Sequence, residues 1–250
     1  MPAMRTQLSI VAPVFNEAGN LGGLVKETAD AMSAAGLDYE LILVDDVSTD
    51  GSREVLAALA EDDVRLRVLG LERHAGQSAA LLAGIRASRA PLIVTMDADL
   101  QNDPADIPAI VALLDDHDVV SGVRAKRKDT ILRRLASRVS NRVRRLVLCD
   151  PCTDIGCALK GYRACVLDDL PPFNGLHRFL PLFALRHGGN YAEIPVGHRA
   201  RTEGASKYSI RGRFLRGIVD LFGVSWYRRR AVSVTVKALE RSPCHPSHPI

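Results

Sequence analysis

The chain has 250 residues, 47% of them hydrophobic and 25% charged, with a formal net charge of +4. This length suits one large domain or two small ones, and the ordinary composition predicts a globular core. The apolar runs are much shorter than the roughly 20 residues that a membrane-spanning helix needs, which argues against a transmembrane protein. The N-terminus MPAMRTQLSIV has no apolar signal core, so a cytoplasmic protein is expected. Five cysteines, an odd number, argue against a disulfide framework.

The first half of the chain alternates short β-rich runs with helical patterns. Strands are predicted over 8–13, 40–45, 66–71, 92–96 and 118–122. Helices are predicted after Asn20, as its cap, and over 51–61, 76–88 and 104–116, the last with Asp103 at its N-cap and Pro104 at its first position. This alternation predicts an α/β fold with a mainly parallel, doubly wound sheet. In such sheets, ligands bind beyond the carboxyl ends of the strands.

The second half contains two basic, amphipathic segments, 131–148 and 211–230. The first is predicted to be a helix with an arginine stripe and an apolar stripe. The apolar stripe comprises Leu132, Leu135, Val139, Val143 and Leu146. From Arg124 to Arg145 the only acidic residue is Asp129, so this surface should face an anionic partner. Nucleic acid is not expected as that partner, because no aromatic residues are interleaved with the basic ones. Residues 231–250 are predicted to be a disordered tail.

The segment 211–230 places apolar side chains, Trp226 among them, between clusters of arginine. This composition suits a helix that lies in a membrane interface.

Acidic residues follow three of the predicted strands at their carboxyl ends. They are Glu17 in PVFNE, Asp45 and Asp46 in VDDVSTDGS, and Asp97 and Asp99 in TMDADLQNDP. If the chain stays extended after Met96, Asp97, Asp99 and Gln101 point to the same side. Carboxylates this close together need a cation, and such oxygen ligands suit Mg2+ or Mn2+ bound together with substrate phosphates. The sequence therefore predicts a divalent ion bridging a diphosphate, and the alternative is that these Asp residues only form turns.

Four motifs, taken with their order and spacing, resemble those of family 2 glycosyltransferases with the GT-A fold. They are PVFNE (13–17), VDDVSTDG (44–51), DADLQ (97–101) and HRARTEGASKY (198–208). The set is most similar to the branch of dolichol-phosphate mannosyltransferases and undecaprenyl-phosphate aminoarabinose transferases, over residues 8–230. The resemblance implies a single catalytic domain over 1–230. It also implies an inverting, Mg2+- or Mn2+-dependent transfer from a nucleotide diphosphate sugar, GDP-mannose or a UDP-sugar, to a dolichyl or undecaprenyl phosphate.

The resemblance also implies roles for single residues. Those matching the surroundings of the nucleotide base and ribose are Pro13, Phe15, Glu17, Val44 and Asp46. Those matching the metal and donor diphosphate site are Asp97, Asp99 and Gln101, with Asp99 the direct metal ligand. Basic residues that would reach the phosphates or the sugar phosphate are Arg124, Arg201 and Lys207, and those matching the acceptor-phosphate site are Arg133 and Ser137. Because a phosphate monoester is already anionic near neutral pH, no side-chain general base is assigned.

Some questions stay open at the level of sequence. The segment CTDIGCALKGYR (152–163) departs from the D-x-x-S-G-F pattern of many relatives, so the sugar is not determined. Many relatives carry C-terminal transmembrane helices, whereas here peripheral contact with the cytoplasmic membrane face is expected through the two amphipathic segments. An oligomer or an integral-membrane partner is a further expectation. The alternatives are a transferase of the same fold with a saccharide or protein acceptor, and an inactive, membrane-associated scaffold.

Overall fold

The computed structural model describes residues 6–125, 142, 144–186, 188–199 and 210–230. Its first elements are β1 (Leu8–Val14), α1 (Ala18–Ala35), β2 (Tyr39–Asp45), α2 (Ser52–Asp62), β3 (Leu66–Gly70), α3 (Gln77–Ala87) and β4 (Leu92–Thr95). They are followed by η1 (Pro104–Asp106), α4 (Ile107–Leu113), β5 (Val119–Arg124), β6 (Lys160–Arg163), η2 (Ala164–Leu167), α6 (Leu176–Ala184), β7 (Tyr191–Val196) and α7 (Ile210–Arg230). The five strands predicted from the sequence are all present.

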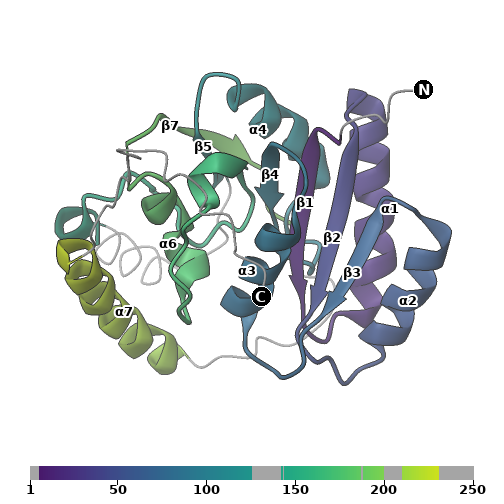
Figure 1. Ribbon diagram of the computed structural model, residues 1–250, viewed down its shortest axis with the longest axis horizontal. Coiled ribbons are helices and arrows are strands. Elements are labelled where there is room, and N and C mark those ends of the chain that lie inside the picture. The colour runs from purple at the N-terminus through teal and green to yellow at the C-terminus, as the bar shows by residue number, and fades with distance from the viewer. Residues whose placement is uncertain (1–5, 126–141, 143, 187, 200–209, 231–250) are drawn as a thin grey trace, which may run out of the picture. The chain divides into compact units, whose positions relative to one another are not determined.

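The strands form one seven-stranded sheet in the order β3-β2-β1-β4-β6-β5-β7. Only β6 is antiparallel to its neighbours, β4 and β5, and the other pairs are parallel. Helix α1 contacts α2 and α4 on one face of the sheet, and α3 contacts α6 on the other (Figure 1). The predicted α/β fold with a mainly parallel, doubly wound sheet is therefore confirmed.

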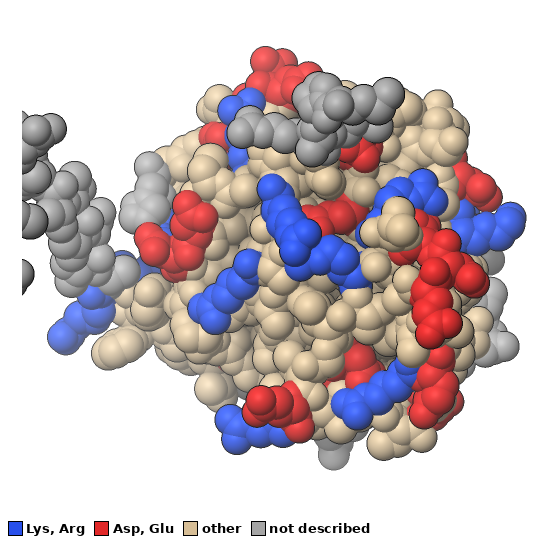
Figure 2. All heavy atoms as spheres, turned by 45° about the vertical axis from the view of Figure 1, so that its right-hand side comes forward, with Lys and Arg blue, Asp and Glu red and all other residues tan. Residues whose placement is uncertain are grey.

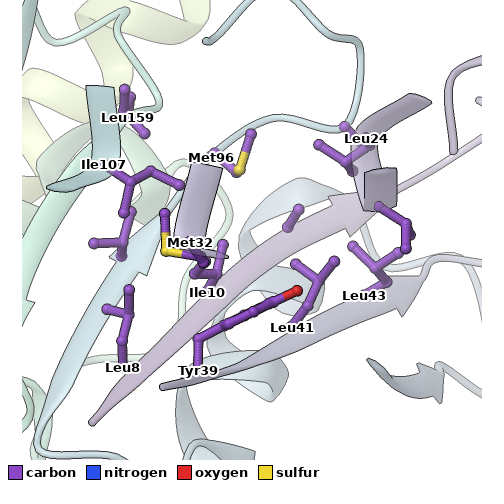
Figure 3. Packing of buried hydrophobic residues seen from close by; sticks show 14 of the residues in the cluster. Leu8, Ile10, Leu24, Met32, Tyr39, Leu41, Leu43, Met96, Ile107 and Leu159 are labelled. Carbon is purple, nitrogen blue, oxygen red and sulfur yellow. The ribbon is translucent and has the colours of Figure 1, made fainter. Parts of the chain in front are cut away.

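The core lies between the central strands and the helices that cover them. Ile10 of β1 and Leu41 of β2 point toward the same apolar layer as Leu24 and Met32 of α1 (Figure 3). These strands are buried along nearly their whole length because helices cover both faces of the sheet. That burial explains why their sequences read as continuous apolar runs, and it fixes the strands whose ends carry the acidic residues.

Two local predictions are wrong. Helix α1 begins at Ala18 with Glu17 at its N-cap, whereas Asn20 lies buried in the first turn and donates a hydrogen bond to Glu17 Oε2 (2.7 Å). The chain after Met96 does not stay extended, because it bends over 98–100 and Leu100 has a φ of 58°. At this bend Leu100 lies against α1, where a Cβ on Gly23 would come within 3.1 Å of Leu100 Cδ1.

The chain forms two compact units, Met1–Ser209 and Ile210–Ile250. Within the second unit, α7 exposes Val219, Phe222 and Trp226, which recur at helical spacing on one side, and it ends in Arg228, Arg229 and Arg230. None of the helices in the described ranges has the length and apolar character needed to cross a bilayer. The tail 231–250 lies outside the described residues, and a single catalytic domain over 1–230 stays a prediction.

Candidate functional site

The carboxyl ends of β1, β2 and β4 lie side by side, because β1 sits between the other two strands. The backbone continues this pairing past the strands: Asp46 N donates to Val14 O (2.8 Å), and Met96 N donates to Val11 O (3.0 Å). The prediction that the three acidic strand ends are neighbours is thereby confirmed.

The loops after β1 and β2 are locked together by side chains that cap the start of α1. Ser52 Oγ accepts from Glu17 N (3.0 Å), and Asp50 Oδ2 accepts from Ala18 N (3.1 Å). These amides have no partner inside the helix, so the second loop satisfies them from outside. Asn16 has a φ of 56°, a left-handed conformation that asparagine adopts more easily than most residues. Together the two loops form a polar surface at the carboxyl ends of β1 and β2.

Asp46 anchors the turn before α3. Its two carboxylate oxygens accept from the backbone amides of Ala75 (2.7 Å) and Gly76 (2.8 Å), and His74 Nδ1 lies 3.0 Å from Oδ2. The ring of His74 packs against Phe15 from the β1 loop, with centroids 4.5 Å apart. Phe15 and Asp46, both expected near the nucleotide base and ribose, therefore converge on the same histidine. A ribose contact with Asp46 would have to share oxygens that already accept hydrogen bonds.

The other residues expected around the nucleotide differ in accessibility. Val44 is fully buried and packs under α3, where a Cβ on Gly84 would lie 3.1 Å from Val44 Cγ2. Only its backbone could reach a ligand. Pro13 pairs with Val44 across β1 and β2 and is half-buried. Glu17, in the loop after β1, is also half-buried.

The DADLQ segment is held from two sides. Asp97 is half-buried, and its Oδ1 accepts from Gln77 Nε2 at the start of α3 (2.8 Å). Asp99 is buried, and its Oδ1 accepts from the backbone amide of Gln101 (3.2 Å). The positions of the two carboxylates are therefore set by the bend at 98–100 and by the hydrogen bond from Gln77 of α3. They are not set by the alternation of side chains along an extended strand.

The segment that follows β7 is hydrogen-bonded to this loop. Arg199 N donates to Gln101 O (2.9 Å), and Gln101 Nε2 donates to Arg199 O (3.3 Å). The Arg199 guanidinium pairs with Glu27 (2.5 Å) and Asp103 (2.7 Å), and these carboxylates raise its pKa. The beginning of HRARTEGASKY thus lies against the acidic loop. Arg201 and Lys207, further along the same motif, lie outside the described residues.

The donor atoms of this loop fit a hard divalent cation. Asp97 and Asp99 offer carboxylate oxygens, the ligands that Mg2+ and Mn2+ prefer. Among the described residues, no group of three or more His, Cys, Asp or Glu side chains is placed to hold a metal ion. An ion here would therefore need further ligands from water or from the phosphates of a substrate, as Mg2+ sites commonly do.

Arg124, at the end of β5, is fixed by a bidentate ion pair. Its Nε and Nη2 each donate to a carboxylate oxygen of Asp154 at 2.8 Å. Gly156 leaves room for the guanidinium, since a Cβ there would lie 2.7 Å from Arg124 Nη2. The loop carrying Asp154 is itself tied to β7, because Thr153 N and Oγ1 donate to the two oxygens of Glu193 (2.6 and 2.7 Å). Arg133 and Ser137, expected at the acceptor phosphate, lie outside the described residues.

Three residues of the site were not singled out from the sequence. Gln77 and Arg199 flank the acidic loop, and Asp154 orients Arg124. A signal existed for Gln77, because it opens a helix directly after the glycine that follows β3 and so faces the carboxyl edge of the sheet. Arg199 and Asp154 meet their partners only through the long-range fold, which local sequence does not reveal.

Comparison with known proteins identifies the family. The model of the glycosyl transferase family 2 matches residues 9–170. The chain is 39% identical over 234 residues to the dodecaprenyl-phosphate galacturonate synthase of Rhizobium johnstonii, covering 91% of this chain and 69% of that protein. It is 40% identical over 205 residues to the undecaprenyl-phosphate 4-deoxy-4-formamido-L-arabinose transferase of an Enterobacter species, covering 81% of this chain and 63% of that protein. The chain thus spans about two thirds of the length of these relatives.

Solved structures share the fold at low sequence identity. A mannosyltransferase of Pyrobaculum calidifontis, in complex with GDP-Man and Mn2+, aligns with a TM-score of 0.66 at 17% identity, over 94% of this chain and 67% of that one. The glucosyl-3-phosphoglycerate synthase of Mycobacterium tuberculosis, with Mn2+ and UDP-glucose, gives a TM-score of 0.66 at 19% identity, over 88% of this chain and 79% of that one. These likenesses support the GT-A architecture. On the family match and the identity to the curated relatives, the chain belongs to the glycosyl transferase family 2.

Proposed function

We propose that this protein transfers a sugar from a nucleotide diphosphate sugar to a polyprenyl phosphate, with inversion at the anomeric carbon. The observation that carries the proposal is that Asp97 and Asp99 follow β4 while Arg124, held by Asp154, ends β5, a strand parallel to β4 with only β6 between them. These residues therefore lie at the same carboxyl edge of the sheet. A diphosphate donor and a phosphate acceptor both need compensation of negative charge, and this edge provides carboxylates for a metal ion and a fixed guanidinium.

The nucleotide is proposed to lie on the polar surface formed by the loops after β1 and β2. Phe15, stacked on His74, offers an apolar ring beside the polar groups of Asp46 and Glu17. This combination suits a nucleobase and a ribose. UDP and GDP sugars fit equally, and the solved structures named above bind one of each.

Mg2+ or Mn2+ is proposed as the cofactor, held through Asp99 and Asp97 with Gln101 nearby. Such an ion would offset the charge that develops on the departing nucleoside diphosphate. Gln77 orients Asp97, and Asp154 orients Arg124 at the same edge of the sheet, where the guanidinium is proposed to donate hydrogen bonds to phosphate oxygens. The acceptor phosphate is itself the nucleophile, so the chain needs no general base.

A polyprenyl phosphate is proposed as the acceptor because the curated relatives are named for dodecaprenyl phosphate and undecaprenyl phosphate. The exposed apolar side of α7, followed by three arginines, supports peripheral contact with a membrane. Arg133, Ser137, Arg201 and Lys207 are proposed as phosphate ligands on the strength of the resemblance alone.

A transfer assay tests the proposal. The purified protein is incubated with undecaprenyl phosphate in detergent together with one labelled UDP or GDP sugar at a time. Each mixture is prepared once with Mn2+ and once with a chelator. We expect label in the lipid extract with one donor, and only when the metal is present. Label on an added oligosaccharide or protein instead would favour the alternative acceptors. Absence of label in every lane, together with nucleotide binding, would favour a scaffold.

A further inference from the structure

Basic side chains gather on the stretch that leads from the segment 131–148 into β6. Residue 142 and residues 144–148 are helical, and the chain then turns at Cys149, which has a φ of 50°. A hollow of about 740 Å³, largely open to solvent, lies beside this helix. The residues that line it are Arg142, Arg145, Leu146, Cys149, Asp150, Pro151 and Thr153.

The residues that this helix exposes and buries differ from the sequence prediction. Leu146, expected on the apolar stripe, has 73% of its surface exposed, and Val147 has 46% exposed. Arg144 and Leu148 are buried instead. Arg142, Arg145 and Leu146 recur at i, i+3 and i+4, so they share one side of the helix and face the hollow together.

The charge of the hollow is positive because its one acid is already neutralised. Arg144 donates from Nη1 to Asp150 Oδ2 and from Nη2 to the carbonyl of Cys152, and Cys152 N donates to Asp150 Oδ1 (2.9 Å). This buried pair satisfies Asp150 from the protein side and fixes the wall of the hollow. Arg142 and Arg145 are exposed, and no acidic partner for either is found among the described residues. Two guanidinium groups are therefore left to meet an external anion.

Exposed apolar residues next to the two arginines in sequence, Leu146 and Val147, indicate where that anion comes from. In the described part of the chain, the large hydrophobic side chains that are exposed comprise Val64, Leu146, Val147, Val219, Phe222, Trp226 and Tyr227. All except Val64 lie in the two basic segments. By contrast, the face shown in Figure 2 carries basic and acidic side chains side by side. A free phosphate would gain nothing from exposed Leu146 and Val147, whereas a lipid at a bilayer surface offers both a phosphate and an apolar layer.

We infer that this hollow binds the phosphate headgroup of an anionic membrane phospholipid, with Arg142 and Arg145 as its ligands and Leu146 in contact with the acyl region. Arg142 and Arg145 are not among the residues assigned above to the donor and acceptor phosphates. The inference rests on the proposed function in one respect, namely that a lipid acceptor brings the protein to a membrane. Its role is to hold the protein on the bilayer at a fixed point beside the loop that carries Asp154.

Vesicle sedimentation tests the inference with the full chain. The vesicles contain phosphatidylcholine, alone or mixed with phosphatidylglycerol, and no polyprenyl phosphate or nucleotide sugar. The test variant is Arg142→Gln with Arg145→Gln. The matched control is Arg86→Gln with Arg89→Gln, which removes the same charge from exposed positions at the end of α3, on the edge of the sheet away from the strand carboxyl ends. Thermal melting checks that both variants fold.

We expect the wild type to bind only the vesicles with phosphatidylglycerol, the test variant to bind them roughly tenfold or more weakly, and the control to bind like the wild type. Equal losses in both variants would mean that net charge alone acts, and unchanged binding of the test variant would mean that the hollow has no part; either result overturns the inference. Failure of wild-type binding overturns it as well. The transfer assay in detergent is independent of these outcomes, so the proposed function can survive them, and the hollow can bind lipid in a protein that transfers no sugar.

Discussion

The guanidinium of Arg124 and the carboxylate of Asp154 form two parallel hydrogen bonds of 2.8 Å across a gap of 30 residues in sequence. A fork of this kind fixes the plane of the guanidinium as well as its position. The loop that holds Asp154 is fastened to β7 through Thr153 and Glu193. The orientation of the Arg124 guanidinium is therefore set by a residue that need not touch substrate.

Replacing Asp154 with Asn should lower the transfer rate on the order of 100-fold, because a misplaced charge near the reacting phosphates costs about that much. Steady-state rates at saturating donor and acceptor measure the effect. Asp63→Asn is the matched control, since Asp63 forms a similar two-bond pair with Arg65 before β3, at the opposite edge of the sheet. Equal activity in the two variants would show that the Asp154 pair is only structural.

Replacing Gln77 with Ala should weaken the apparent affinity for Mn2+ by roughly tenfold, because Asp97 loses the partner that orients it. Gln77→Glu should be more damaging, since it places a second carboxylate beside Asp97. Activity as a function of Mn2+ concentration gives both values. Gln7→Ala, at the start of β1, serves as the control. If Mn2+ dependence is the same in all four proteins, Gln77 does not support a metal ligand.

Asp99 and Asp103 should respond differently to truncation. Asp99→Ala should remove transfer activity at saturating Mg2+ or Mn2+, because the metal loses its direct ligand. Asp103 caps η1 by accepting from Ala105 N (3.1 Å), so Asp103→Ala should lower the free energy of unfolding by about 1 kcal/mol. Chemical denaturation and the transfer assay separate the two effects. Full activity in Asp99→Ala would contradict the proposed metal site.

The stability of the protein should fall at acidic pH partly through His177. Burial, with smaller contributions from Arg178 and Lys160, lowers the pKa of His177 from 6.5 to about 3. Its Nδ1 lies 2.7 Å from Ser78 Oγ, which also accepts from Gly175 N and so joins α3 to α6. Because the folded pKa is below the unfolded one, the unfolded chain takes up the proton first as the pH falls. This contribution to stability is complete above about pH 6.5 and is lost from there down toward about pH 3.

Urea denaturation over that range, in the wild type and in His177→Gln, isolates this term from the titration of carboxylates. The wild type should lose stability relative to the variant by up to about 1.4 kcal/mol per pH unit. Parallel pH profiles for the two proteins would show that His177 is accessible to protons in the folded state.

The sequence was most informative where local pattern and burial agree. Both faces of β1 and β2 are covered, so their apolar runs indicated buried strands, and the acidic residues after them indicated the edge of the sheet that carries the candidate site. Strands β6 and β7 and helix α6 escaped prediction. β6 has only four residues, KGYR, two of which are polar, and Lys160 is buried all the same with its ammonium group donating to the carbonyl of Cys157. Such a strand is stabilised by its neighbours more than by its own residues.

The acidic loop shows the other limit. Its position beside the other acidic strand ends was predicted correctly, but the expectation that the chain stays extended there is wrong. The left-handed Leu100 and the contact with Gly23 depend on α1, which lies far away in sequence. The roles of Asp97, Asp99 and Gln101 in metal binding stay predictions until the variants above are measured.

The antiparallel strand β6 has a consequence for how such enzymes change. Lys160 pairs with Ser121 of β5, so the chain leaves the sheet after Arg124 and re-enters it beside the same strand, at the same edge. The stretch between them therefore starts and ends beside the same strand, and its loop at Thr153 and Asp154 bonds to Glu193 of β7 and to Arg124. A change in the length of this stretch would leave the register of β1, β2 and β4 unaltered, and the nucleotide is proposed to bind at the ends of these strands. With the acceptor proposed to bind at this stretch and the donor at the ends of β1 and β2, a change in acceptor preference would not require a change in the donor site.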